Sequence, residues 1–360
     1  MKPEKLKATE SIFLKACRGE KTDRIPVWFM RQAGRSLPGY RALRKKYGVL
    51  TLTQTPELAA QVSMEPIELL GVDAAILFAD IMLLPIAMGI DVKIVDSVGP
   101  VIAEPIDTPE KISRLQMFSP DKVAYLQETI KILRKNLGEV GERTGSPVPL
   151  IGFSGAPFTL ASYLIEGKPT RTWFATKRFM LEHPEAWNQL MGLLSDGITE
   201  YLRTQIKAGA QAVQLFDSWV GCLSPAEYRQ YVLPHVQRVF SSLKNEGVPR
   251  IHFGTNTAGI LKEFSDVDCE VIGVDWRISL GDAQQIINAR GNKNNGTKTV
   301  QGNLDPLIVL APWDVLKKTV DEMLAEIDPK KGYIFNLGHG VPPEADDKVL
   351  KKLVDYIHEK

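Results

Sequence analysis

Short, continuously apolar runs recur along the chain and are the main signal of its architecture. Most lack the apolar–polar alternation of a half-exposed strand, so they are typical of strands buried on both faces of a parallel sheet. Each run is followed by a segment whose apolar residues have helical spacing. The predicted strands are Ile25–Met30, Ala74–Phe78, Val148–Phe153, Ala212–Phe216, Arg250–Phe253, Val271–Asp275, Thr299–Gly302 and Tyr333–Leu337.

The helical segments between these runs have recognisable ends. The Ser119-Pro120-Asp121 run combines a capping residue, a first-turn proline and an acid at the positive end of the helix dipole. It predicts a helix that ends at Gly138. Ser224 and Glu227 have the spacing of a capping box, and Pro234 predicts a bend in the helix that follows them.

The alternation of eight strands with helices predicts an α/β fold, namely a single (β/α)8 TIM barrel. A doubly wound open sheet is the alternative. The segment Asp91–Pro105 is expected to form a small inserted hairpin, and Gly291–Gly296 a polar surface loop. No repeat, low-complexity tract or linker divides the sequence, so residues 1–360 are expected to form one domain. In such a barrel, the carboxyl ends of the strands carry the chemistry.

Composition adds limits on compartment and partners. The 360 residues include 44 Lys+Arg and 43 Asp+Glu, a formal charge of +1, which argues against nucleic acid as the partner. Three widely spaced cysteines fit a reducing compartment. The amino-terminal residues lack the apolar core of a signal sequence, and the longest uncharged run, residues 144–165, is broken by prolines and glycines. We therefore expect a cytoplasmic protein that does not enter the membrane.

The strongest local feature is the basic segment RQAGRSLPGYRALRKK, residues 31–46, which has six positive charges and no acid. A guanidinium group gives two parallel hydrogen bonds to a carboxylate or phosphate. Arg31 and Arg35 directly follow a predicted barrel strand, which favours a binding loop for a polyanion. Lys45 and Lys46 are better interpreted as solvated surface charges.

Two further candidates follow predicted strands. Asp80 is a lone carboxylate in an apolar stretch; it is either the cap of the next turn or a group that accepts ligand donors or stabilises charge. His339 lies between two glycines, and glycine allows close approach of a ligand. His252, at the end of another strand, is expected to be a core residue.

Tyr163 and Ser218 are weaker candidates on the residues alone. Tyr163 is typical of ordinary helix packing, and Ser218 has a capping role as its alternative, since no neighbouring histidine supports an activated nucleophile. The sequence has no GxxxxGK[ST] motif, no GxGxxG opening a helix after a strand, and no HExxH. It also has no Cys/His cluster, so no metal site is predicted.

Five blocks together resemble one family. PVWFMRQAGRSLPGYR (26–41) is similar to the signature of the uroporphyrinogen decarboxylases. The other four blocks resemble the remaining family blocks in the same order, over essentially the whole chain: FADIMLLPIAMG (78–89), GFSGAPFTLASYLIEG (152–167), LFDSWVGCLSP (215–225) and FNLGHGVPPE (335–344).

The resemblance implies a single barrel, usually a homodimer, that removes carbon dioxide from the four acetate side chains of uroporphyrinogen III to give coproporphyrinogen III. It implies no metal and no organic cofactor, and it makes Asp80 and Arg31 the catalytic candidates. The positions that match family substrate-binding residues are Arg31, Gln32, Ala33, Gly34, Arg35, Arg44, Asp80, Tyr163, Ser218 and His339.

Two other functions stay open. Related barrels transfer methyl groups from corrinoids to thiols with a zinc held by an H-x-C pair and a later cysteine. Here the corresponding run is His252-Phe253-Gly254, so the first thiolate is missing. The third possibility is a tetrapyrrole carrier without catalytic activity.

Overall fold

One curved sheet of parallel strands forms the centre of the computed structural model, which describes residues 10–95, 98–289 and 297–360. The order of the strands in the sheet follows their order in the chain, as in a succession of βα units around a barrel. The prediction of a TIM-barrel fold is confirmed. The strands of the sheet are β1 (Ala75–Ile76), β4 (Leu150–Gly155), β5 (Ala212–Asp217), β6 (Arg250–Gly254), β7 (Val271–Gly273), β8 (Thr299–Leu304) and β9 (Tyr333–Leu337).

The first predicted strand, Ile25–Met30, occupies the eighth position but is not a regular strand. Val27 forms a single parallel bridge with Phe335 of β9. On its other side, the backbone carbonyl of Val27 accepts a hydrogen bond from Asp73, 2.7 Å away and just before β1. The expected strand is therefore wrong in extent, because Pro26 has no N–H and the Val27 N–H bonds to the Asp73 carboxylate instead of a neighbouring strand.

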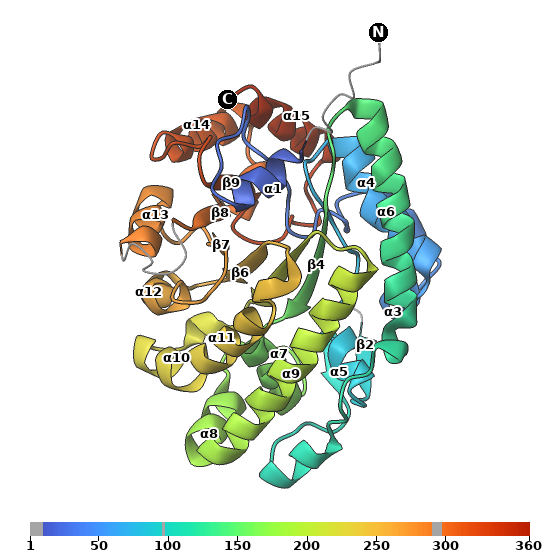
Figure 1. Cartoon of the computed structure of the whole chain (residues 1–360), viewed down its shortest axis with the longest axis vertical. Coiled ribbons are helices and arrows are strands. Elements are labelled where there is room, and N and C mark those ends of the chain that lie inside the picture. Colours follow the sequence, from blue (N-terminus) through green and yellow to red (C-terminus); the bar gives the residue numbers. More distant parts are fainter. Residues whose placement is uncertain (1–9, 96–97, 290–296) are drawn as a thin grey trace.

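Helices surround these strands on the outside (Figure 1). The long helices α4, α6 and α9 pack side by side along one side of the molecule, and α11 packs on α9. None of the described helices is long and apolar enough to cross a membrane. The helices are α1 (Ile12–Cys17), α2 (Pro38–Arg44), α3 (Val49–Gln54), α4 (Pro56–Leu70), α5 (Leu83–Ala87), α6 (Ala124–Thr144), α7 (Pro157–Glu166), α8 (Phe174–Glu182), α9 (Pro184–Ala208), α10 (Pro225–Tyr231), α11 (Leu233–Ser242), α12 (Leu261–Phe264), α13 (Leu280–Asn288), α14 (Trp313–Leu324) and α15 (Asp347–His358).

The predicted ends of α6 need correction. The segment after Ser119 is a short 3-10 turn and the Ser119 side chain caps nothing, so α6 begins at Ala124. The helix continues through Gly138 to Thr144, because its buried face extends to Val140. Gly145, at φ +70°, takes the left-handed conformation that ends it.

Other local predictions are confirmed. Ser224 and Glu227 form the capping box of α10, and the helix is interrupted before Pro234, where α11 begins at Leu233. The inserted hairpin is present as the antiparallel strands β2 (Val92–Val95) and β3 (Gly99–Ile102). The loop predicted over Gly291–Gly296 lies outside the described residues.

Candidate functional site

The segments that follow the strands contact one another in sequence around the carboxyl end of the barrel. A Cβ atom on Gly340 would lie 2.3 Å from Cδ of Arg31, and one on Gly338 would lie 2.7 Å from the backbone nitrogen of Trp276. Hydrogen bonds and glycine contacts of this kind continue from β7 to β6 and from β6 to β5. The segments that follow the strands are therefore in contact with one another, and they form one continuous rim at the carboxyl end of the barrel.

Arg31 is held in an unusual conformation at this rim. Its φ is +59°, a value that residues other than glycine rarely adopt, and the methylene groups of its side chain lie against Gly340. Gly34 is needed beneath it, since a Cβ there would be 2.8 Å from the Arg31 carbonyl oxygen. The guanidinium forms no ion pair within the described residues. It is exposed and thus available to an anionic ligand.

Gln32 and Ala33 support the loop. The Gln32 side chain is fully buried; it donates to the Ala74 carbonyl at 2.9 Å and accepts from the Phe29 N–H at 2.9 Å. Its amide therefore anchors the loop to the start of β1 and is not free for a ligand. Ala33 packs against the small cluster around Tyr40.

The other two candidate arginines, Arg35 and Arg44, act electrostatically on Tyr40 of α2. Burial raises the pKa of Tyr40, while the positive charges of Arg44 and Arg35 act in the opposite direction. The negative charge of Asp80 also reaches this ring. The charges of Arg35, Arg44 and Asp80 thus all act on one aromatic residue, which the sequence alone does not single out.

Asp80 follows β1 and is partly buried. Its Oδ1 accepts a hydrogen bond from the Met82 N–H at 2.8 Å, so the turn-capping alternative is present. Burial raises the pKa of the carboxyl, and the Met82 hydrogen bond and the charge of Arg31 lower it. The two candidate interpretations are compatible, because one N–H leaves the remaining acceptor sites of the carboxylate open.

Tyr163 lies on α7 and stacks on Trp219, with ring centroids 3.9 Å apart. Burial, and then the charge of Asp80, raise the pKa of Tyr163 to about 12, so its hydroxyl stays protonated at neutral pH. Thr159, one turn earlier, donates to the Asp217 carboxylate at 2.9 Å and accepts from the Trp219 N–H at 3.3 Å. The stack is therefore fixed to the end of β5.

Ser218 and Asp217 are neighbours in the chain with different surroundings. Ser218 is partly buried at the rim, and its carbonyl accepts a hydrogen bond from Thr255. Asp217 is fully buried, with Oδ2 3.8 Å from Nε2 of His252. His252 is itself fully buried and stacks on Phe264, which confirms its assignment to the core.

His339 stands on the loop after β9, between the contacts that Gly338 and Gly340 make. Burial, and then the positive charges of Arg31 and Arg277, lower the pKa of His339 to about 4. The imidazole is therefore neutral at physiological pH. The two glycines allow close approach, as predicted, but what approaches them is the protein itself, namely Trp276 and Arg31.

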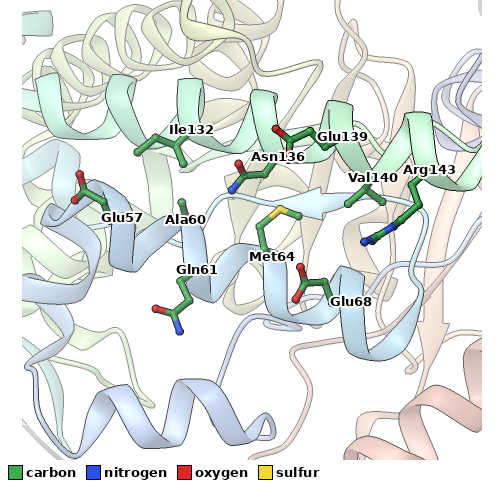
Figure 2. A pocket seen from close by; sticks show the side chains of 10 residues that line it. All are labelled: Glu57, Ala60, Gln61, Met64, Glu68, Ile132, Asn136, Glu139, Val140 and Arg143. Atoms are coloured by element: carbon green, nitrogen blue, oxygen red, sulfur yellow. The ribbon is translucent and has the colours of Figure 1, made fainter.

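A groove of about 630 Å³ lies apart from this rim, between α4 and α6 (Figure 2). Figure 2 shows Glu57, Glu68 and Glu139 along it together with the one cation, Arg143. A net negative lining repels an anionic ligand. In the part of the chain that the structure describes, no group of three His, Cys, Asp or Glu residues could hold a metal ion.

Sequence reasoning missed the residues that position others. Trp219 belongs to the block LFDSWVGCLSP (215–225), but the sequence assigns it no role, and it singles out neither Tyr40 nor Thr159. Their roles depend on contacts between segments far apart in the chain, such as the stack of Trp219 on Tyr163. The only available signal was position, since Trp219 follows a strand end by two residues.

Comparison with known proteins gives consistent matches. Residues 8–360 match the family described as uroporphyrinogen decarboxylase (URO-D). A uroporphyrinogen decarboxylase from Bacillus pumilus (strain SAFR-032) is 47% identical over 99% of this chain and 97% of its own length. One from Bacillus subtilis (strain 168) is 49% identical over 96% of this chain and 94% of its own length.

Solved structures agree on the fold. A methyltransferase from Methanosarcina mazei superposes with a TM-score of 0.73 at 21% identity, covering 97% of each chain. A putative vitamin-B12-independent methionine synthase from Listeria monocytogenes has a TM-score of 0.55 at 10% identity, covering 94% of this chain and 95% of that one. At these identities, the likeness concerns the fold alone.

Proposed function

The chain belongs to the uroporphyrinogen decarboxylase family, and from this membership we propose that it converts uroporphyrinogen III to coproporphyrinogen III at the carboxyl end of the barrel. It is a carboxy-lyase of tetrapyrrole biosynthesis that acts on a small-molecule substrate. The charges at this end of the barrel support the proposal, since Arg31 acts electrostatically on the Asp80 carboxylate and both act on Tyr163.

The substrate has eight carboxylates around a flexible ring of four pyrroles, and the basic segment suits its rim. Arg31, Arg35 and Arg44 would each take a carboxylate of the substrate through their guanidinium groups. Arg31 and Arg35 are exposed side chains on the loop after the first barrel segment. In the proposal, Gln32, Ala33 and Gly34 hold that loop in the shape that presents Arg31.

Asp80 would accept the four pyrrole N–H groups at the centre of the macrocycle. Convergent donors stabilise the charged form of a carboxylate, which offsets the effect of burial on its pKa. Apolar residues follow it directly: Ile81 is partly buried, whereas Met82, Leu83 and Leu84 are fully buried. A ring of pyrroles over Asp80 would thus meet one fixed negative charge, with the accessible part of Ile81 as apolar surface beside it.

The chemistry that follows needs an electron sink. Protonation of a pyrrole carbon makes that ring cationic; the bond between the acetate methylene and its carboxylate then breaks, carbon dioxide leaves, and the electron pair neutralises the ring. A proton added to the methylene gives the methyl group, and loss of the first proton restores the pyrrole. Asp80 stabilises the cation electrostatically. The substrate supplies its own sink, so the proposed mechanism requires no cofactor.

The remaining matched residues would orient the substrate. Tyr163 keeps its proton at neutral pH and would donate a hydrogen bond, and neutral His339 can donate from one ring nitrogen and accept at the other. Ser218 would donate a hydrogen bond to a carboxylate of one of the substrate's side chains. Arg31, with a bound water, is the proposed route for the proton, since arginine alone is a poor acid.

The wider setting is part of the proposal. The family profile extends over residues 8–360, which supports treating the chain as one domain. A homodimer in the cytoplasm is the expectation for this family, and the three free cysteines fit a reducing compartment. Elemental analysis for zinc and a test for bound tetrapyrrole without turnover would separate the methyltransferase and carrier alternatives.

The deciding experiment is product analysis with uroporphyrinogens I and III under anaerobic, reducing conditions. The expected result is release of four carbon dioxide molecules per uroporphyrinogen III and accumulation of coproporphyrinogen III. Binding of the macrocycle without carbon dioxide release would favour the carrier, and zinc at one equivalent would favour methyl transfer.

A further inference from the structure

Arg277 lies at the same end of the barrel and has none of the roles proposed above. It comes four residues after β7 ends at Gly273. Its backbone N–H and one guanidinium nitrogen both donate to the Asp275 carboxylate. Its guanidinium carbon also lies 4.1 Å from the centroid of the Trp276 ring. The group is thus held from two sides, by a carboxylate and by an aromatic face.

The ion pair with Asp275 leaves Arg277 with capacity for a ligand. The Arg277 side chain is 44% exposed, whereas that of Asp275 is 1% exposed. Asp275 also accepts a hydrogen bond from the Asn256 N–H, so backbone donors already satisfy it in part. A guanidinium has five N–H donors, and within the described ranges only Nη1 of Arg277 has a side-chain partner. The pair with the buried Asp275 has a structural role of its own, but it uses only one side of the guanidinium and leaves the exposed donors of Arg277 for a ligand.

The position of Arg277 mirrors that of Arg31 about His339. Gly338 lies against Trp276 on one side of the histidine, and Gly340 lies against Arg31 on the other. Both guanidinium groups are close enough to affect the imidazole electrostatically. The loop after β9 therefore separates two cations that come from different parts of the barrel.

We propose that Arg277 is a further substrate-binding residue, which takes a carboxylate of the tetrapyrrole on the side of His339 opposite Arg31. The inference rests on the proposed function. The carboxylates of the substrate surround its whole rim, whereas Arg31, Arg35 and Arg44 come from one segment beside β9. In the sheet, β8 and β9 separate β7 from that segment. Arg277 can therefore bind a carboxylate on a part of the macrocycle edge that the arginines of the basic segment do not reach.

The test compares Arg277→Gln with a matched control, Arg18→Gln. Arg18 is also ion-paired and is 38% exposed, but it lies beside α1 at the amino end of the barrel. We expect Arg277→Gln to raise KM for uroporphyrinogen III about tenfold, with kcat within about twofold, since a charge-assisted hydrogen bond is lost. Arg277→Lys should recover part of the loss, and Arg18→Gln should change neither constant.

The double variant Asp275→Asn, Arg277→Gln separates loss of the cation from exposure of an unpaired carboxylate. A raised KM in the double variant supports the proposal; a KM restored to the wild-type value overturns it, as does a KM in Arg277→Gln no higher than in Arg18→Gln. Thermal unfolding identifies any variant that fails to fold.

A binding measurement keeps this inference separate from the proposed function. Fluorescence titration with uroporphyrin III, which carries the same eight carboxylates, needs no turnover. If the wild-type protein releases no carbon dioxide, the proposed function fails, while an approximately tenfold weaker Kd in Arg277→Gln would still support carboxylate binding at Arg277. An unchanged Kd overturns it.

Discussion

Asp80 illustrates how opposing effects on one residue set the chemistry. Burial favours the protonated acid, whereas the Met82 N–H and the charge of Arg31 favour the carboxylate. Substrate pyrrole N–H groups would add to the second effect. The proposed role needs the negative charge of Asp80. The two direct tests are therefore to replace the carboxylate by mutation and to protonate it by lowering the pH.

Asp80→Asn should keep the fold and lower kcat by about 10²–10³-fold, the range seen when a preorganised charge-stabilising group is removed. The amide still accepts the Met82 N–H, so unfolding should change little. Steady-state product formation measures the effect, with Asp107→Asn as the control at an exposed carboxylate. Near-normal turnover of Asp80→Asn would contradict the proposed role.

The pH dependence of the activity also tests Asp80, because the direction of its pKa shift predicts where activity is lost. Because the pKa of Asp80 is raised, kcat/KM should fall as the pH drops through a value above that of an ordinary aspartate. The limb in kcat should lie at lower pH, since bound N–H donors favour the carboxylate. His339 gains its charge only as the pH falls toward its own pKa of about 4, and Asp80→Asn distinguishes the two groups. An unchanged acid limb in the residual activity of Asp80→Asn would assign it to another group.

At the scale of elements, the loop after β9 positions Arg31 by leaving space for it. Arg31 adopts φ +59° and its stem fills the volume where a side chain at position 340 would lie. Gly340 is therefore required because it has no side chain. The close contact involves Cβ, Cγ and Cδ of Arg31, so relief requires movement of the whole side chain.

Gly340→Ala is expected to lower kcat/KM about tenfold or more through displacement of Arg31, with a small change in unfolding free energy. Gly138→Ala is the matched control: it lies within α6 with nothing within 4 Å of the added Cβ. That control should leave kcat/KM unchanged and stabilise the protein by about 0.5–1 kcal/mol. Equal activity of the two variants would remove the positioning role of Gly340.

At the scale of the whole molecule, one acid links three segments at the point where the barrel closes. Asp73 is 5% exposed and accepts from the Val27 N–H at 2.8 Å, from Arg24 at 2.6 Å and from His358 at 2.8 Å. It thereby joins the first barrel segment, the start of β1 and the last helix, α15. Without it, the N–H of Val27 and the cation of Arg24 lose their partner.

Asp73→Ala should destabilise the protein by about 2–4 kcal/mol, since a buried acceptor of charged donors is removed. Urea unfolding followed by circular dichroism measures it. The control, Asp355→Ala, removes an exposed acid that pairs with Lys351 on α15, and should cost less than about 0.5 kcal/mol. A loss for Asp73→Ala as small as that of the control would show that closure rests on packing instead.

The strands and the site differ in how far sequence could predict them. Apolar runs identified all seven strands of the sheet, because burial on both faces leaves a strong local pattern. The segment Ile25–Met30 was expected to be a full strand. This was wrong, because the Val27 N–H bonds to the side chain of Asp73, far away in the sequence, instead of to a neighbouring strand. Gln32 matched a binding position, yet its amide is used within the protein. Trp219 and Tyr40 were missed because their contacts are long-range.

What the sequence determined by itself is the alternation of buried strands and helices, the arginine-rich segment and the order of the family's blocks. These depend on residue type and spacing, which are local properties. Only the tertiary structure decided which cations act on His339, which glycines make room for Arg31, and which segments Asp73 links where the barrel closes. Each of these depends on distances between residues far apart in the chain, and those distances exist only once the barrel has closed.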